Sequence, residues 1–221
     1  MVIFMDENLI VRLEREKVVS ATFRKLGTAK KDKVYKAALN AFGEDVFDRV
    51  VLDDIARLAG VSKGSLIQYF GFKKNLLSFL AEMVVCSYEN YFDDYFSSET
   101  AVRTKDRIER FFLKHLDFRK NFSGEFGFIL LMLYENSGAL SNRFIMTIFD
   151  IQHRYIQKII ERGVQTNQLR RDVRSRYLVS VLHSIFISLL REYFLDRSAI
   201  RKSDFEIHLG RSLNLVFNGV K

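Results

Sequence analysis

Apolar residues recur at three- and four-residue spacing along almost the whole chain of 221 residues. This is the period of an amphipathic α-helix, whereas a half-buried strand alternates apolar and polar residues. No stretch sustains such an alternation, and no internal repeat is found. The sequence also contains no Pro, the residue that most strongly breaks a helix. The pattern therefore predicts an all-α fold.

The helical pattern divides the chain into three predicted parts. Residues 1–27 form an N-terminal extension, flexible or helical, that serves as a basic arm. Residues 28–75 form a second part that contains two short helices, and residues 76–221 form a larger helical body. Beside two short helices, the expected helices span residues 31–42, 73–98, 102–120, 126–136, 141–162, 173–195 and 203–218. Gly163 is expected to end the helix 141–162 as its C-cap.

Composition narrows the class of partner. The net charge of +8 favours polyanionic partners. Cys86 is the only cysteine, so neither a disulfide framework nor a zinc cluster is expected. The start MVIFMDENLI is too short and too acidic for a signal peptide, and the most apolar run, 177–190, is too short to span a bilayer. These features predict a soluble cytoplasmic protein.

The stretch DDIARLAGVSKGSLIQYF, residues 53–70, predicts two short helices joined by a tight turn. Gly60 permits the turn, and Ser62 is placed to cap the second helix with its hydroxyl. Leu66 and Phe70, four residues apart, face inward onto the first helix. Two short helices joined in this way form a helix-turn-helix motif.

Burial of Leu66 and Phe70 leaves the other face of the second helix outward. On that face, Gln68 can bond adenine, Ser65 can bond several base edges, and Ile67 can touch a thymine methyl group. The predicted DNA-contacting residues are Lys63, Gly64, Ser65, Ile67, Gln68, Tyr69 and Lys73. Lys63 and Tyr69 are expected to reach phosphates.

From about Lys33 to Met83, the chain resembles the DNA-binding region of the TetR/AcrR family of bacterial transcriptional repressors. The matching stretches are KAALNAF, DDIARLAGVS, KGSLIQYF and FKKNLL. The resemblance implies an all-α homodimer in which residues 28–75 form a helix-turn-helix DNA-binding domain and residues 76–221 form a divergent helical ligand-binding and dimerisation domain. It also implies that Lys63, Gly64, Ser65, Ile67 and Gln68 approach bases, while Tyr69 and Lys73 hold phosphates.

The sequence departs from the family pattern at three places. Ile67 stands where Tyr is usual, and the 27-residue extension is longer than the family usually has. Val50 and Val51 replace the polar Thr that commonly opens the first helix of the motif, which removes a cap. These departures concern the contacts with the operator and leave the fold unaffected.

The helix expected at 173–195 is apolar nearly all the way round. A soluble helix of this kind must be covered on every side, and a chain of this size offers cover on one side. A second subunit is the natural source of the rest, so a homodimer is expected. Its interface would be a four-helix arrangement of residues 173–195 and 203–218 from each subunit.

The body is expected to enclose a mostly apolar cavity for an effector of unknown identity, although the same side chains could simply fill a core. The candidate ligand-binding residues are Tyr91, Phe112, His115, Phe128, Met132, Phe149 and His153. The aromatic excess suggests a flat or apolar ligand. Together with the motif, this predicts a ligand-responsive repressor that is released from a palindromic DNA operator.

The alternative function is an enzyme with an active site in the helical body. No catalytic motif, nucleotide-binding loop or nucleophile–base pair can be recognised, so no catalytic residue, cofactor or metal site is predicted. The four histidines are widely spaced in sequence and are expected to be structural. A peripheral membrane protein is a third reading, but the extension mixes acidic with basic residues, so no membrane partner is expected.

Overall fold

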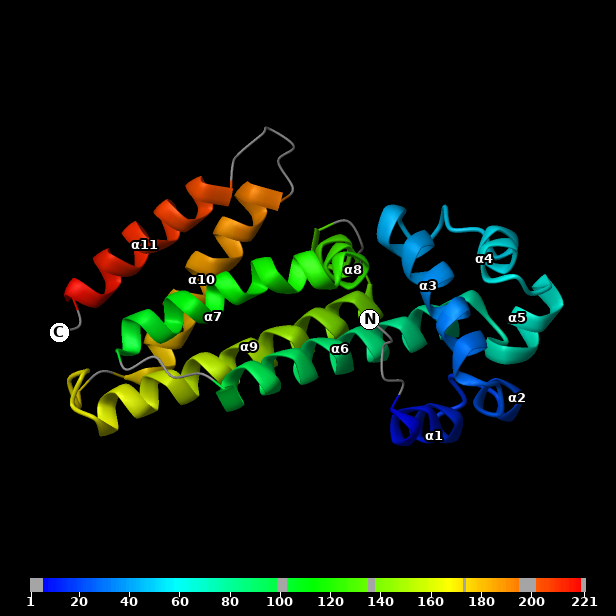
Figure 1. Cartoon of the computed structure of the whole chain (residues 1–221), viewed down its shortest axis with the longest axis horizontal. Helices are drawn as coiled ribbons and strands as arrows, with labels where there is room; N and C mark the ends of the chain where they lie inside the picture. The colour runs from blue at the N-terminus through cyan, green and yellow to red at the C-terminus, as the bar shows by residue number, and fades with distance from the viewer. Residues whose placement is uncertain (1–5, 99–102, 135–137, 173, 195–201, 220–221) are drawn as a thin grey trace. The chain divides into compact units, whose positions relative to one another are not determined.

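The computed structural model describes residues 6–98, 103–134, 138–172, 174–194 and 202–219, and these ranges contain helices and no strand (Figure 1). The helices are α1 (Glu7–Arg15), α2 (Ala21–Arg24), α3 (Thr28–Glu44), α4 (Leu52–Ala59), α5 (Lys63–Phe70), α6 (Lys73–Ser98), α7 (Thr104–Asn121), α8 (Ser123–Tyr134), α9 (Ala139–Gln165), α10 (Ser175–Phe194) and α11 (Lys202–Gly219). The all-α prediction is confirmed.

The chain packs into two compact units. The first comprises Met1–Asp94 with Phe122–Thr147, and the second comprises Tyr95–Asn121 with Ile148–Lys221. Helices α6 and α9 therefore contribute residues to both units. The units are defined by packing, and the division of functions at residue 75 stays a prediction.

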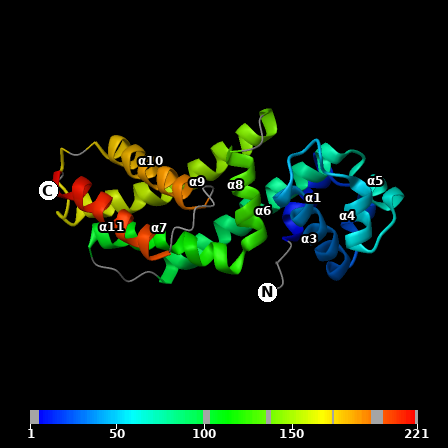
Figure 2. The same cartoon turned by 90° about the horizontal axis from the view of Figure 1, so that it is seen from above.

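In the first unit, α3 packs against both α4 and α8 (Figures 1 and 2). Its core centres on the fully buried Tyr35, whose ring lies 6.3 Å from that of Phe79 on α6. The Tyr35 hydroxyl donates a hydrogen bond of 3.1 Å to Glu125 on α8. Burial raises the pKa values of both the Tyr35 hydroxyl and the Glu125 carboxyl, so both groups favour their protonated forms.

The N-terminal extension is helical from Glu7 and is packed against the motif. Phe23 on α2 is fully buried, and its ring lies 4.9 Å from Phe70 on α5 and 5.1 Å from Phe79 on α6. Leu13 on α1 is also fully buried. The extension thus shares a hydrophobic core with the helix-turn-helix. In its described residues it contains two helices, which is one of the two forms predicted for it.

In the second unit, α11 packs on α7 and α10. Phe112 of α7 stacks on Phe186 of α10 with ring centroids 4.5 Å apart. The unit covers one side of α10, where Leu182, Phe186 and Leu190 are buried. Among the described side chains of α10, the large apolar ones that remain exposed are Tyr177 and Val181.

Several predicted helix boundaries differ from the structure by two or three residues, and at two of them a glycine is the reason. Helix α8 begins at Ser123 instead of residue 126, and Gly124 lets it approach α3: a Cβ there would lie 2.9 Å from Leu39. Helix α9 continues through Gly163 to Gln165. Gly163 is therefore a position of close packing inside a helix instead of a C-cap, since its Cβ would lie 2.4 Å from the hydroxyl of Thr104.

Candidate nucleic-acid interface

The turn between α4 and α5 is built as the sequence predicts. Gly60 ends α4 in the left-handed conformation, with φ of 66°, which a residue with a side chain rarely adopts. The Ser62 hydroxyl accepts a hydrogen bond of 3.0 Å from the Ser65 amide and so caps α5. On the inner face of the motif, Leu66 and Phe70 are buried together with Ile55 of α4.

The opposite face of α5 is open. Lys63, Gly64 and Gln68 are exposed, and 46% of the Ile67 surface is exposed. The hydroxyl of the half-buried Ser65 lies 2.9 Å from that of Ser62. The packing therefore places an amide, a hydroxyl and an aliphatic side chain along one outward face, which suits the edges of bases in a major groove.

Lys63 is outward but not free. Its ammonium lies 2.8 Å from the Asp53 carboxylate on α4, with both side chains more than half exposed. An exposed pair of this kind is weak, so a phosphate could replace the carboxylate. Lys63 therefore remains a predicted DNA contact.

Tyr69 does not face outward as predicted, because only 4% of its surface is exposed. Its ring lies 5.8 Å from that of Phe23, and its carbonyl accepts a hydrogen bond of 2.8 Å from the Ser20 amide. The extension thus covers a position that the helical pattern of α5 alone would leave open. The predicted phosphate contact of Tyr69 would require its hydroxyl to reach solvent beside the extension.

Lys73 at the start of α6 has a structural partner that the sequence did not reveal. Its ammonium donates hydrogen bonds to the carbonyls of Phe47, at 2.6 Å, and Val50, at 3.0 Å. It also lies 4.4 Å from the centre of the Phe47 ring. These contacts form a clip that ties the segment before α4 to α6. The predicted phosphate contact of Lys73 stays a prediction beside this role.

The clip has a consequence for α4. Val51 is its N-cap and makes no side-chain hydrogen bond to the helix, as the replacement of the usual Thr predicts. The preceding carbonyl, that of Val50, is held by Lys73. Lys73 therefore fixes the entry to a helix that has no capping side chain of its own.

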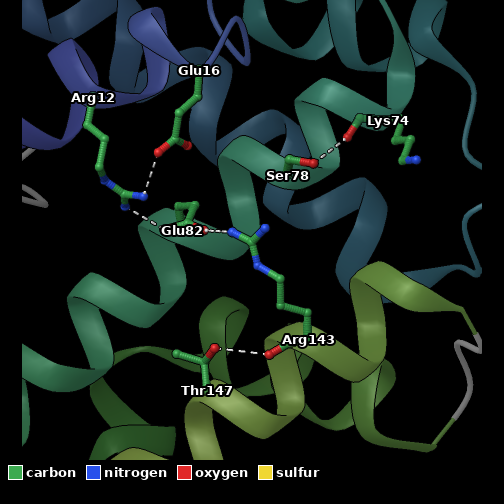
Figure 3. A network of polar contacts seen from close by, with 7 residues as sticks. All are labelled: Arg12, Glu16, Lys74, Ser78, Glu82, Arg143 and Thr147. Carbon is green, nitrogen blue, oxygen red and sulfur yellow. Dashed lines mark hydrogen bonds and ion pairs between the residues drawn. The ribbon is translucent and has the colours of Figure 1, made fainter.

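Glu82 on α6 joins three helices in the first unit, as Figure 3 shows. Its carboxylate lies 2.6 Å from the guanidinium of Arg12 on α1 and 3.0 Å from that of Arg143 on α9. Arg12 also reaches Glu16 at 3.3 Å. The hydrogen bond that Arg12 donates to the Glu82 carboxylate raises the pKa of Arg12. The network fastens the extension to the helix that follows the DNA-binding motif.

The seven candidate ligand-binding residues fall into two groups, one in each unit. In the first unit, Tyr91 is half-buried, whereas Phe128 and Met132 are buried. In the second unit, Phe112 and His115 are buried on α7, and Phe149 and His153 are half-buried on α9. Their role as ligand contacts stays a prediction.

Histidines far apart in sequence come together in the second unit. The His183 ring lies 4.4 Å from that of His153 and 4.6 Å from that of Phe149. Its Nε2 donates to the Gln152 side-chain oxygen at 2.6 Å. His115 bonds the Phe111 carbonyl through Nδ1 at 2.9 Å. Sequence spacing gave no sign of this cluster, because its members come from α7, α9 and α10.

His115 and His183 are uncharged at neutral pH because burial lowers the pKa of each. Burial lowers the pKa of His115 to about 3. Burial, followed by the nearby His153, lowers the pKa of His183 to about 4. Within the described ranges, no group of three or more His, Cys, Asp or Glu side chains is arranged to hold a metal ion. His115 and His183 therefore offer neutral hydrogen-bonding groups among aromatic rings.

The helix-turn-helix matches a known family of DNA-binding proteins. The profile of "Bacterial regulatory proteins, tetR family" matches residues 34–78, which cover the motif and the start of α6. Over these residues the chain is similar to the DNA-binding region of the tetR family. The match agrees with the outward face of α5 and supports DNA-binding transcriptional regulation as the function.

Solved structures of tetR-family regulators share the fold over most of the chain. FadR from Bacillus subtilis, in complex with stearoyl-CoA, has a TM-score of 0.68 at 15% identity and covers 86% of this chain and 98% of its own. SmeT, the repressor of a multidrug efflux pump of Stenotrophomonas maltophilia, has a TM-score of 0.66 at 16% identity, covering 86% and 90%. At these identities the likeness concerns the fold. No curated protein sequence matches the chain.

Among the described residues, no helix combines the length and apolarity that crossing a bilayer requires.

Proposed function

We propose that the protein is a dimeric repressor that binds a palindromic DNA operator in the cytoplasm and is released by a small, largely apolar or aromatic ligand. The observation that carries the DNA-binding part is the outward face of α5. Ser65, Ile67 and Gln68 lie on it, while Leu66 and Phe70 anchor the helix from behind. A recognition helix must be packed against the domain on one face and expose side chains that can contact base edges on the other.

Replacement of Gln68 by Ala tests this part. A side chain that reads a base edge contributes about 1–3 kcal/mol of discrimination at one position. We expect the Gln68→Ala variant to relax sequence preference at one symmetric pair of operator positions and to keep its salt dependence. The operator is the best-binding duplex selected from a random pool, and Lys120→Ala, an exposed change on α7, is the control. A Gln68→Ala variant that altered only the salt dependence would contradict base reading.

Exposed apolar side chains support the dimeric part. Tyr177 and Val181 are four residues apart on α10, and Ile207 and Leu215 are exposed on α11. All four are large hydrophobic residues on two packed helices of the second unit. A four-helix interface with a second subunit would cover them. We expect Val181→Glu to give monomers by light scattering, whereas a monomeric unaltered chain at micromolar concentration would contradict the proposal.

The effector site is proposed in the second unit, around the cluster of His115, His153 and His183. Phe112, His115, Phe149 and His153 belong to the predicted set, and His153 Nε2 is buried without a hydrogen-bond partner among the described residues. A ligand with an apolar body and one polar group would suit these surroundings. FadR, solved with stearoyl-CoA, provides one chemical class to test, long acyl chains; the aromatic ligand suggested by the sequence is the second.

Release from the operator is the relevant readout for this effector. We expect a long-chain acyl compound or a polycyclic aromatic compound to dissociate the protein from the selected duplex. The His153→Leu variant should need a higher concentration of the same compound while binding DNA normally. If neither class releases the unaltered protein, the proposed ligand chemistry is wrong.

A further inference from the structure

We propose that the N-terminal extension forms a second DNA-contacting edge, and that the sugar–phosphate backbone beside α5 lies in a groove between the extension and this helix. The inference rests on the proposed function, because it supposes that α5 enters the major groove. It adds a contact surface outside the helix-turn-helix, with Lys17 and Lys25 as the phosphate-binding residues.

The first observation is a groove of about 470 Å³ in the first unit. One wall belongs to the extension and includes Lys17, Ser20 and Ala21, while the other includes Ile67 and Gln68 of α5. Two of the side chains expected to read bases therefore also line the groove. A surface continuous with the base-reading face lies next to the DNA whenever that face is engaged.

The second observation is that the extension is held at this place. The Ser20 amide donates to the Tyr69 carbonyl at 2.8 Å. The Asn75 side chain donates to the carbonyls of Phe70, at 2.8 Å, and Lys17, at 3.3 Å. Together with the buried Phe23 ring, these bonds fix the segment 17–23 against the C-terminal end of α5. The groove wall is thus preorganised, which reduces the entropic cost of binding.

The third observation is charge. Lys17 and Lys25 are exposed, and in the part of the chain that the structure describes neither ammonium has an ion pair. Arg24, by contrast, is neutralised by Glu14. Phosphates line both sides of a major groove that holds a recognition helix. Lys17 lines the groove beside α5, and Lys25 ends α2, which packs on α5. Both ammonium groups would then neutralise the backbone on that side.

The test is a double variant, Lys17→Ala with Lys25→Ala, compared with Lys120→Ala with Arg171→Ala, which removes two exposed charges from the second unit. Each phosphate contact contributes about 0.9 to the slope of log affinity against log salt. We expect the extension variant to show a salt dependence shallower by about two per half-site, and an affinity lower by about tenfold or more at roughly 0.1 M salt. The control should match the unaltered protein.

Ethylation interference locates the contacts. With the unaltered protein, ethylation of the phosphates beside Lys17 and Lys25 should weaken binding, and these positions should become silent in the extension variant. The Gln68→Ala variant should keep them. Identical interference patterns and salt slopes for the extension variant and the unaltered protein would overturn this inference and leave the proposed function standing.

Two other outcomes are also decisive. A changed base preference in the extension variant would overturn the backbone assignment, since phosphate contacts carry no sequence information directly. Failure of the unaltered protein to select any duplex would overturn the proposed function itself. Both lysines are exposed, so thermal unfolding of the double variant should match that of the unaltered protein.

Discussion

Replacement of Lys73 by Met should destabilise the DNA-binding motif even when no DNA is bound. Met keeps most of the length of the side chain but loses the charge and all three donors. The variant leaves the carbonyls of Phe47 and Val50 without their partner, at atoms now 2.6 and 3.0 Å from the ammonium. It also removes a cation from the face of the Phe47 ring.

The magnitude follows from these contacts. A hydrogen bond to a charged group contributes about 1.5–3 kcal/mol, and a cation–π contact about 0.5–1 kcal/mol at an exposed site. The contacts share one ammonium that is partly exposed, so they do not add in full. We expect a loss of about 2–3 kcal/mol, or a fall of roughly 1 M in the urea midpoint for a unit of this size.

Lys74 provides the matched control. It is the next residue on α6 and is exposed, so Lys74→Met removes the same charge from the same helix end without breaking the clip. Circular dichroism should report the urea midpoint, and hydrogen exchange should report faster opening of amides 45–51 in the Lys73→Met variant alone. Equal midpoints and equal exchange for both variants, with a shallower DNA salt slope for Lys73→Met, would refute the clip and leave Lys73 as a phosphate ligand only.

Three further predictions concern other contacts. The unfolded chain binds a proton at His183 near pH 6.5, and the folded chain only near pH 4. The free energy of unfolding should therefore fall by about 1.4 kcal/mol per pH unit between these values. In urea titrations, the His183→Gln variant should lose about 2 kcal/mol less stability than the unaltered protein from pH 7 to pH 5. Gly163→Ala should destabilise by about 1–3 kcal/mol through its collision with Thr104, whereas Gly210→Ala, whose Cβ would meet nothing closer than 3.5 Å, should be neutral or stabilising by up to about 1 kcal/mol; equal urea midpoints would contradict the packing argument. Glu82→Gln should lower stability by about 1 kcal/mol at low salt and by less at high salt, since its two arginine contacts are partly exposed, and a loss unaffected by salt would argue against an ion-pair network.

The features predicted correctly are those whose causes lie close together in sequence. Ser62 caps a helix that begins at the next residue, and Gly60 ends the helix before it. The inward positions of Leu66 and Phe70 follow from helical spacing alone. Because the helix-turn-helix is compact and local, its sequence contains nearly all the information needed to place its outward face.

The features that were missed depend on contacts between distant segments. Tyr69 is buried by Phe23, which precedes it by more than forty positions in the sequence. Three histidines of the second unit, His115, His153 and His183, come together because the three helices that carry them pack together. Gly163 resembled a C-cap, and only its closeness to Thr104 shows why a helix continues through it. Periodicity reports which side of a helix is buried but not what covers it.

Contacts between distant segments also limit what the net charge says about DNA binding. Several cations near the motif are already engaged within the first unit, and for these a phosphate must compete with an existing partner. They are Arg24, Lys31, Lys63, Arg57 and Lys73. Among the described residues 6–78, the exposed cations without an ion pair are Arg15, Lys17, Lys25, Lys30, Lys33 and Lys74.

Most of these uncompensated charges lie in the extension or at the start of α3, and Lys74 alone lies at the start of α6. Counterion release depends on charges that become neutralised on binding, so the uncompensated set should dominate the salt dependence even though α5 reads the bases. Affinity and sequence preference would then be carried by different segments of one unit. Substitutions in the extension should change affinity and its salt dependence, and substitutions on α5 should change sequence preference.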